Sequence, residues 1–397
     1  MKSSITFYTT AVLFLLILNV QGLSAQGCVA VRQMGGTMMC GANSSTNSYN
    51  LNQGDFQIGS TYRYFHSWRH FVSTEEQPLR QTTGGGHDAN GKELGNAVNI
   101  YSHALDFNVS YGLSNRFQVN ATLPFVHNER SQVLRTKTDT LRYSVYAKGL
   151  ADARFSINYW VFDPQKVHNG NLMIGLGLKT NTGSYKATDD APQGGGVTAN
   201  VVMDQAIQPG DGGIGFSVEL QAFRHLYRGI YGFASGYYLF NPKESNGTFK
   251  SKATPGLEGY NIYASPDQYL MRAGLMGSIG HENNLNYSLA GRMEGIPAYD
   301  ALGGQVAYRR PGYVIAVEPG LSYRVGNHTI SVFVPYNVVR NRIQSAADIA
   351  SENLQNAKIT DLAKKVHVQG DAAFADYSIN IGYTYRFVKT KAVKEEE

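Results

Sequence analysis

Polar and apolar residues alternate strictly in several stretches of this sequence. In the segment "SINIGYTYRF", from Ser378 to Phe387, Ile, Tyr and Phe occupy every second position and Ser, Asn, Gly, Thr and Arg occupy the positions between. Successive side chains of a β-strand point to opposite faces of the sheet. The pattern therefore predicts a strand with one apolar face and one polar face.

The same alternation recurs along the chain and predicts about twelve strands, each of the roughly 9–11 residues that a tilted transmembrane strand needs. The other eleven segments lie near residues 54–64, 101–111, 117–125, 151–162, 172–182, 214–223, 230–240, 269–279, 285–293, 313–324 and 329–338. The register of the segment 230–240 is ambiguous, because bulky residues stand at both parities.

The charges of these predicted strands all share the polar parity. They are Asp55, Arg63, Asp106, Arg116, Asp152, Arg154, Lys179, Glu219, Arg272, Arg292, Glu294, Glu318, Arg324 and Arg386. A lipid-facing Arg or Lys costs roughly 2–4 kcal/mol at the middle of a bilayer, so a membrane excludes charge from one face of each strand. A soluble sandwich would place its charges outside and its apolar residues inside.

The connections between the segments alternate in length. Short links such as "GLSN" and "RVGNH" alternate with long polar ones at residues 67–98, 184–210, 241–267 and 341–372. Short periplasmic turns and long extracellular loops are typical of outer-membrane barrels. We therefore predict an all-β fold: a membrane-spanning, antiparallel, up-and-down β-barrel with both ends in the periplasm.

The N-terminal residues predict export. Lys2 precedes the apolar run "AVLFLLILNV", and small residues follow it, so we expect a signal peptide at 1–25 that is cleaved after Ala25. A periplasmic segment at 26–53, a barrel at 54–388 and a charged periplasmic tail at 389–397 complete the predicted organisation. A retained anchor, or a lipoprotein modified at Cys28, is the alternative. The predicted location is the outer membrane of a Gram-negative bacterium.

The cysteines, the net charge and the histidines indicate which covalent links, partners and cofactors to expect. Cys28 and Cys40 lie in an oxidising compartment, which favours a disulfide, although two exposed thiols are the alternative. The net charge of +5 comes without a long basic run and does not indicate nucleic acid. The ten histidines show no metal-ligand spacing, and no cofactor is expected. Asp204 and Asp211, in one long loop, are candidates for binding a surface cation.

Several motifs resemble a known family. "YGLSNRFQVNATLPFV", "GLADARFSINYWVF", "IGLGLKTNTGSY" and "IQPGDGGIGFSVELQAF" lie in the middle third of the chain. They resemble the outer-membrane barrel family associated with the meta pathway of phenol degradation, whose members are taken to be channels. The resemblance implies membership of this family and an outer-membrane location more than a substrate. For the barrel as a whole, we expect passive uptake of small organic solutes, aromatic or anionic ones among them. The final strand, from Ser378 to Phe387, is similar to the terminal strands that the barrel-assembly machinery recognises.

A channel function would depend on the side chains that face the lumen. The predicted lining charges are Arg63, Asp106, Asp152, Arg154, Lys179, Glu219, Arg272, Arg292, Glu294 and Glu318. One interpretation is an electrostatic filter with a basic outer vestibule. The other is a ladder of paired charges that stabilises a nearly closed lumen. Phe65, Tyr238 and Phe240 are predicted to face inward near the outer mouth, where they would contact a solute.

Two other classes of function compete with the channel. A structural barrel with a closed lumen would act through its extracellular loops, one of which has helical composition at residues 345–365. A hydrolase at the rim would need a nucleophile beside a base. The one candidate group in the sequence is His66, Ser67 and His70. Adjacent strand residues point apart, however, so we do not expect an enzyme.

Overall fold

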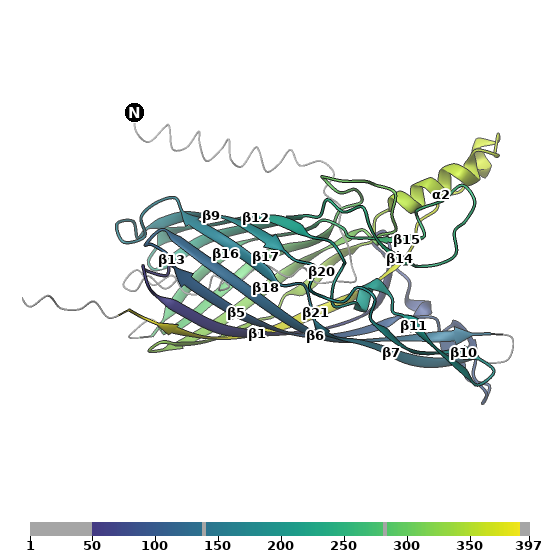
Figure 1. Cartoon of the computed structure of the whole chain (residues 1–397), viewed down its shortest axis with the longest axis horizontal. Helices are drawn as coiled ribbons and strands as arrows, with labels where there is room; N and C mark the ends of the chain where they lie inside the picture. The colour runs from purple at the N-terminus through teal and green to yellow at the C-terminus, as the bar shows by residue number, and fades with distance from the viewer. Residues whose placement is uncertain (1–49, 137–139, 281–283, 390–397) are drawn as a thin grey trace, which may run out of the picture.

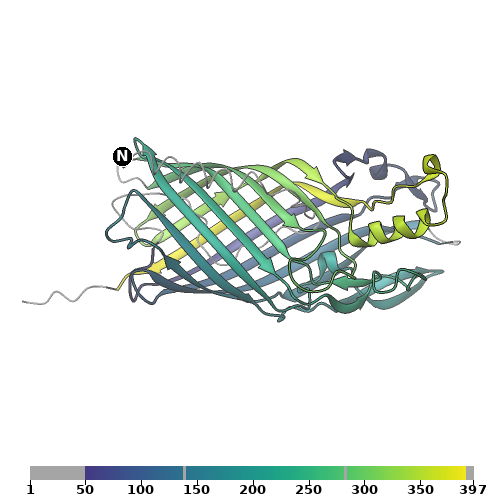
Figure 2. The same cartoon turned by 90° about the horizontal axis from the view of Figure 1, so that it is seen from above.

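A closed antiparallel barrel dominates the computed structural model, which describes residues 50–136, 140–280 and 284–389 (Figures 1 and 2). Its wall is built from β1 (Phe56–Val72), β5 (Asn99–Gly112), β6 (Phe117–Arg135), β7 (Thr140–Leu150), β8 (Arg154–Trp160), β9 (Gly170–Lys179), β12 (Gly215–Tyr227), β13 (Ile230–Phe240), β16 (Gln268–Ile279), β17 (Leu285–Ile296), β18 (Gly312–Val325), β19 (His328–Phe333), β20 (Tyr336–Asn341) and β21 (Ala372–Phe387).

The sheet has twelve positions around the barrel. β7 and β8 lie end to end against β6, and β19 and β20 lie end to end between β18 and β21. The first and last strands close the ring, with Phe56 opposite Phe387. Closure pairs the backbone groups of every strand, as hydrocarbon requires. The predicted fold class and strand number are confirmed.

The burial of side chains is the reverse of that in a soluble protein. Large apolar residues in the middle of the wall are among the most exposed, such as Leu176 at 58% and Leu289 at 57%, whereas the inward-facing Glu318 is fully buried. Apolar atoms that line the outside of a closed barrel face hydrocarbon rather than water. The barrel therefore presents an apolar belt outward and a polar lumen inward.

The two ends of the barrel differ. The start of β1 and the end of β21 lie at one end, together with the short turns, and the long loops extend from the other end (Figure 1). Those loops carry α2 (Ala346–Asn356), the short strands β2 (Glu75–Glu76), β3 (Gly84–His87), β4 (Glu93–Gly95), β10 (Thr188–Gly194), β11 (Val197–Val202), β14 (Ser245–Phe249) and β15 (Ile262–Ala264), and the 3-10 turns Pro78–Gln81, Gln205–Ile207 and Leu362–Lys364.

The helix α2 begins with a capping box. Ser345 accepts a hydrogen bond from the Asp348 amide at 3.1 Å, and the Asp348 carboxylate accepts one from the Ser345 amide at 2.9 Å. The helix extends away from the barrel (Figure 1), and its burial is only partial. Among the described residues, we find no helix that has both the length and the apolar character needed to span a membrane.

Two details differ from the sequence-based prediction. The strand β7 was missed; its outward Lys148 is exposed, which fits a strand that continues beyond the apolar belt. The strand predicted at 329–338 is interrupted near Pro335, a residue without an amide hydrogen. The predicted signal peptide, the Cys28–Cys40 disulfide and the tail from residue 390 lie outside the described residues.

The outward belt makes a testable prediction. Leu289→Arg places a charge in the middle of β17, and we expect the free energy of unfolding to fall by about 2–4 kcal/mol. The measurement is urea unfolding of the protein refolded into lipid vesicles. The control is Leu362→Arg, because Leu362 is even more exposed, at 78%, but lies in an extracellular loop. Equal losses in the two variants would contradict the assignment of the belt.

Candidate functional site

The ten charged residues predicted to line the lumen all face inward in the structure. None of these residues is more than 8% exposed: Arg63, Asp106, Asp152, Arg154, Lys179, Glu219, Arg272, Arg292, Glu294 and Glu318. Charges that are buried this deeply need partners, because the desolvation of an unpaired ion costs several kcal/mol. Their partners divide most of them into distinct groups.

Four of the ten form a connected ladder across β16, β17 and β18. The Glu318 carboxylate accepts hydrogen bonds from the guanidinium groups of Arg272 and Arg292, the second at 3.0 Å. Arg292 also donates to Glu294 at 2.6 Å. These contacts match the paired-charge interpretation. The ladder fixes three neighbouring strands across the middle of the lumen.

A second group anchors a loop at the outer mouth. Lys179 donates to Asp211 at 2.6 Å and to the carbonyl oxygen of Gly213 at 2.7 Å, and its Nζ lies 3.4 Å from Asp152. Asp152 also accepts hydrogen bonds from the amides of Gly183, at 2.9 Å, and Asp211, at 3.2 Å. Asp152 and Lys179 therefore hold the segment 203–213, which we call the cap, against the barrel wall.

The anchor lies where the wall is interrupted between β7 and β8. A side chain at Gly210 would place its Cβ 2.5 Å from the Gly183 carbonyl oxygen and 2.7 Å from an Asp152 oxygen. Real Cβ atoms do not approach other atoms so closely, so only glycine lets the cap contact the wall here. The Thr182 hydroxyl accepts a hydrogen bond from the Ala153 amide at 2.8 Å. This backbone N–H therefore has an acceptor although the strand is interrupted here.

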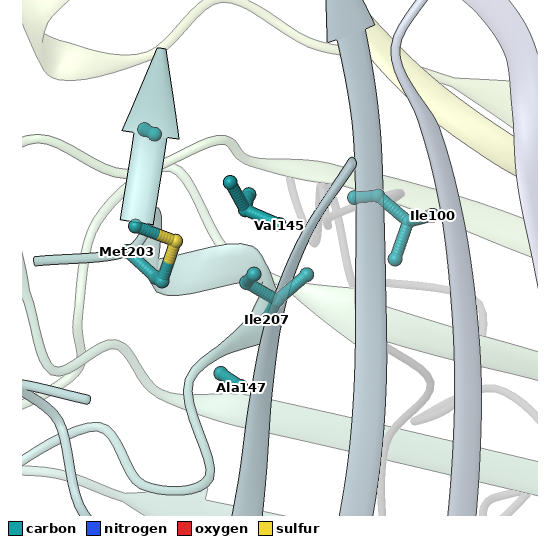
Figure 3. Packing of buried hydrophobic residues seen from close by; sticks show 6 residues of the cluster. Ile100, Val145, Ala147, Met203 and Ile207 are labelled. Atoms are coloured by element: carbon teal, nitrogen blue, oxygen red, sulfur yellow. The ribbon is translucent and has the colours of Figure 1, made fainter. Parts of the chain in front are cut away.

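The cap also packs against apolar residues of the barrel wall. Figure 3 shows Ile207 and Met203 of the cap beside Ile100, Val145 and Ala147 of the wall, and Ile207 is fully buried. The carbonyl oxygen of Ile207 accepts a hydrogen bond from Asn128 of β6 at 2.9 Å. Apolar packing and a wall contact thus hold the cap inside the outer mouth of the barrel.

A carboxylate on the cap joins three other elements, and we call Asp204 with its partners the latch. Arg310 donates two hydrogen bonds to Asp204, at 2.8 and 2.7 Å, and the Tyr263 hydroxyl donates a third at 3.0 Å. The guanidinium of Arg130 on β6 lies 3.8 Å away. Burial raises the pKa of Asp204, but the charges of Arg310 and Arg130 and its hydrogen bonds outweigh burial and hold this pKa well below 3.8.

A pocket of about 110 Å³ lies beneath the cap, inside the outer half of the lumen. Arg63, Arg154, Lys179, Arg309 and Arg310 line it together with Asp152 and Asp211, and Phe65, Ile296 and Tyr308 add apolar surface. The ladder residues lie further along β16, β17 and β18, on the side away from the cap. The pocket is therefore bounded by the cap outside and followed by the ladder inside.

The structure separates the aromatic residues that were predicted to contact a solute. Phe65 lines the pocket, as predicted. Tyr238 and Phe240 face outward, because Phe240 stacks at 4.9 Å on Phe216, an outward residue that is 42% exposed. The prediction for these two residues was wrong. Tyr237, the residue before Tyr238, faces inward instead. Because β13 carries bulky residues on both of its faces, the alternation of its sequence did not show which face is inward.

The residues considered for catalysis or for metal binding have other partners. His66 stacks on Tyr101 at 4.1 Å, whereas Ser67, the next residue of the strand, is buried. His70 lies 2.6 Å from Asp371 and accepts a hydrogen bond from the Val98 amide, so neither histidine is paired with Ser67 in the described part of the chain. Within the described ranges, no group of His, Cys, Asp or Glu side chains is arranged to hold a metal ion.

The sequence did not identify the latch. Asp204 and Asp211 drew attention as candidates for a surface cation, but the structure gives them Arg310 and Lys179 as partners. Arg309 and Arg310 lie in the loop between β17 and β18, and no periodicity in a loop indicates which way a side chain points. The sequence showed only that two long loops carry charged residues. This does not indicate which of those residues form ion pairs.

Comparison with known proteins supports the fold. No family model matches the chain, and no curated protein sequence matches it. Among solved structures it resembles the COG4313 outer-membrane channel from Pseudomonas putida F1, with a TM-score of 0.51 and 9% identity over 86% of this chain and 99% of that one. At that identity the likeness shows the fold alone, which is that of an outer-membrane β-barrel.

Two further solved structures are less similar to this chain, with TM-scores below 0.5. A FadL homologue of Pseudomonas aeruginosa has a TM-score of 0.39 and 8% identity, over 91% of this chain and 98% of that one. The toluene transporter TbuX of Ralstonia pickettii has a TM-score of 0.38 and 11% identity, over 93% and 100%. With its closed wall and apolar belt, the chain is a barrel of the Gram-negative outer membrane. The resemblance to the phenol-degradation family stays a prediction.

The ladder makes a prediction about stability. Glu318→Gln removes the charge that Arg272 and Arg292 share, and breaking a buried pair in this way costs about 3–5 kcal/mol. We expect the free energy of unfolding, measured by urea titration in vesicles, to fall by that amount. Glu258→Gln changes an exposed loop carboxylate and should leave the free energy of unfolding nearly unchanged. Similar small losses in both variants would contradict the ladder.

The latch makes a prediction about pH. Because the pKa of Asp204 is lowered, its contribution is complete above the ordinary value of 3.8 and is lost only as the pH falls through the lowered value. We expect the hydrogen-exchange protection of residues 203–213, corrected for the intrinsic exchange rate, to be equal at pH 7 and pH 5. Asp204→Asn should reduce protection at both. Loss of protection in the unmodified protein at pH 5 would rule out this latch.

Proposed function

We propose that this protein is an outer-membrane channel for the passive uptake of small organic solutes. The observation that carries the proposal is the pocket beneath the cap, which keeps about 110 Å³ open inside a lumen that is lined by buried charged residues. A barrel of about eight strands is filled by its own side chains, and one of sixteen holds a water channel, so twelve strands leave room for a narrow path.

The path that we propose has two barriers. A solute from outside first meets the cap, which the latch and the Lys179 anchor hold in the mouth. Beyond the pocket it meets the ladder around Glu318. Polar lining groups and narrow constrictions are the features by which channels select solutes. The cap is the barrier more suited to opening, because it is a loop segment rather than a part of the wall.

A second function is favoured by the ladder itself. If the paired charges shut the lumen, the barrel would be a structural protein that acts through its extracellular elements, among which α2 and the β10–β11 hairpin extend from the outer end (Figure 1). The two functions differ in one measurable property. A closed barrel conducts no ions, whereas a channel opens at least transiently.

The proposal extends to family and assembly. We propose membership of the barrel family associated with the meta pathway of phenol degradation, on the motifs described above. We also propose that the barrel-assembly machinery recognises Ser378 to Phe387. This segment lies in β21, whose pairing with β1 closes the barrel.

Conductance in planar bilayers tests the channel. Asp204→Asn should weaken the latch, and a change of about 1 kcal/mol in the opening equilibrium raises the open probability about fivefold. The matched control is Asp190→Asn, an exposed carboxylate of the same loop, which should leave the open probability unchanged. Correctly inserted barrels that stay silent in all three forms would contradict the proposal and favour the structural function.

A further inference from the structure

One guanidinium in the pocket has neither a hydrogen-bond acceptor nor an ion-pair partner among the described residues. Arg154 is 6% exposed, and its Nε and Nη1 atoms donate no hydrogen bond. No carboxylate lies within ion-pair distance of it in the described structure. The carboxylate of Glu219 is close enough to interact electrostatically, but neither of its oxygens accepts a hydrogen bond, and Glu219 does not line the pocket.

The other cations of the pocket are committed elsewhere. Lys179 lies 2.6 Å from Asp211, Arg309 lies 2.6 Å from Asp300, and Arg310 lies 2.7 Å from Asp204. Arg63 donates to the side-chain oxygen of Asn380 at 3.0 Å. The two carboxylates that line the pocket, Asp152 and Asp211, are both in contact with Lys179. Arg309 also has nitrogens without a hydrogen bond, but Asp300 lies beside it. Arg154 is thus the lining cation that has neither a hydrogen bond at Nε and Nη1 nor an ion pair among the described residues.

Leaving these donors unused is costly. A buried polar group without a hydrogen bond costs about 1–3 kcal/mol, and more when the group is charged. The planar guanidinium presents paired donors that match the two oxygens of a carboxylate. A ligand carboxylate would supply the acceptors that Arg154 lacks, together with a negative charge within ion-pair distance.

The remaining pocket surface suits an apolar body. Phe65, Ile296 and Tyr308 line the same space. The volume of about 110 Å³ compares with a cavity of about 150 Å³ that holds benzene in another protein, and this pocket is not fully enclosed. A carboxylate on a short chain or on a single ring is therefore of suitable size.

We infer that Arg154 binds the carboxylate group of a small organic acid in the pocket beneath the cap. This inference rests on the proposed channel function and names the class of solute. The acid's oxygens accept hydrogen bonds from the Arg154 guanidinium, and its chain or ring lies against Phe65 and Tyr308. A neutral solute of the same shape lacks the charge that Arg154 requires.

Equilibrium binding to the purified full chain in detergent tests the inference. The probes are butyrate and benzoate, each compared with its neutral amide, and the measurement is an NMR titration of the ligand signals. We expect at least one acid to bind at least tenfold more tightly than its amide. Arg154→Gln should weaken that acid at least tenfold, which corresponds to about 1.4 kcal/mol, without changing the affinity for the amide.

Two variants serve as controls. Arg224→Gln removes the same charge from an exposed position near the periplasmic end of β12 and should bind as the unmodified protein does. Arg154→Lys keeps the charge without the paired donors and should fall between the unmodified protein and Arg154→Gln. Each variant is first shown to be folded by its heat-dependent migration in gels.

Two outcomes would overturn the inference. One is that neither acid binds more tightly than its amide, and the other is that Arg154→Gln binds the acids as well as the unmodified protein does. Binding in detergent needs no passage through the lumen, so this test is separate from the test of the channel. A barrel that binds the acid but stays silent in bilayers would contradict the proposed function alone.

Discussion

A strand that crosses hydrocarbon must pair its backbone groups and keep charge away from the lipid. In this barrel both requirements are met by closure: β1 pairs with β21, and the inward parity of the strands takes the charges. A lumen of twelve strands is too narrow to hydrate so many ions separately. The arrangement of the interior follows from the need to pair charges in a confined space.

The interior charges meet that need in different ways. Arg272, Arg292 and Glu318 pair with one another across neighbouring strands, so they stabilise the wall from within. Asp152 and Lys179 pair with groups of the cap and so fix a loop in the mouth. Arg154 has no such partner. Glu219 also forms no ion pair among the described residues, but of these two only Arg154 lines the pocket, where a ligand carboxylate would supply the missing acceptors.

The barrel could be predicted from the sequence because alternation is a local property of each strand. The ladder could be predicted only as a possibility, since Glu318 is 26 residues from Arg292 and 46 from Arg272, and their pairing depends on the register of separate strands. The strand β7 escaped prediction because charge is tolerated on both faces beyond the belt. The latch escaped it because the loops that carry Asp204 and Arg310 have no periodicity to interpret.

The most direct test of the central claim is the flux of a small organic acid into vesicles that contain the purified barrel, without an energy source. Radiolabelled butyrate should accumulate inside to the external concentration, faster than in protein-free vesicles and in proportion to the number of barrels, while a labelled disaccharide of greater size enters more slowly. Equal rates of butyrate entry with and without the barrel would contradict the claim that this lumen is a path for solutes.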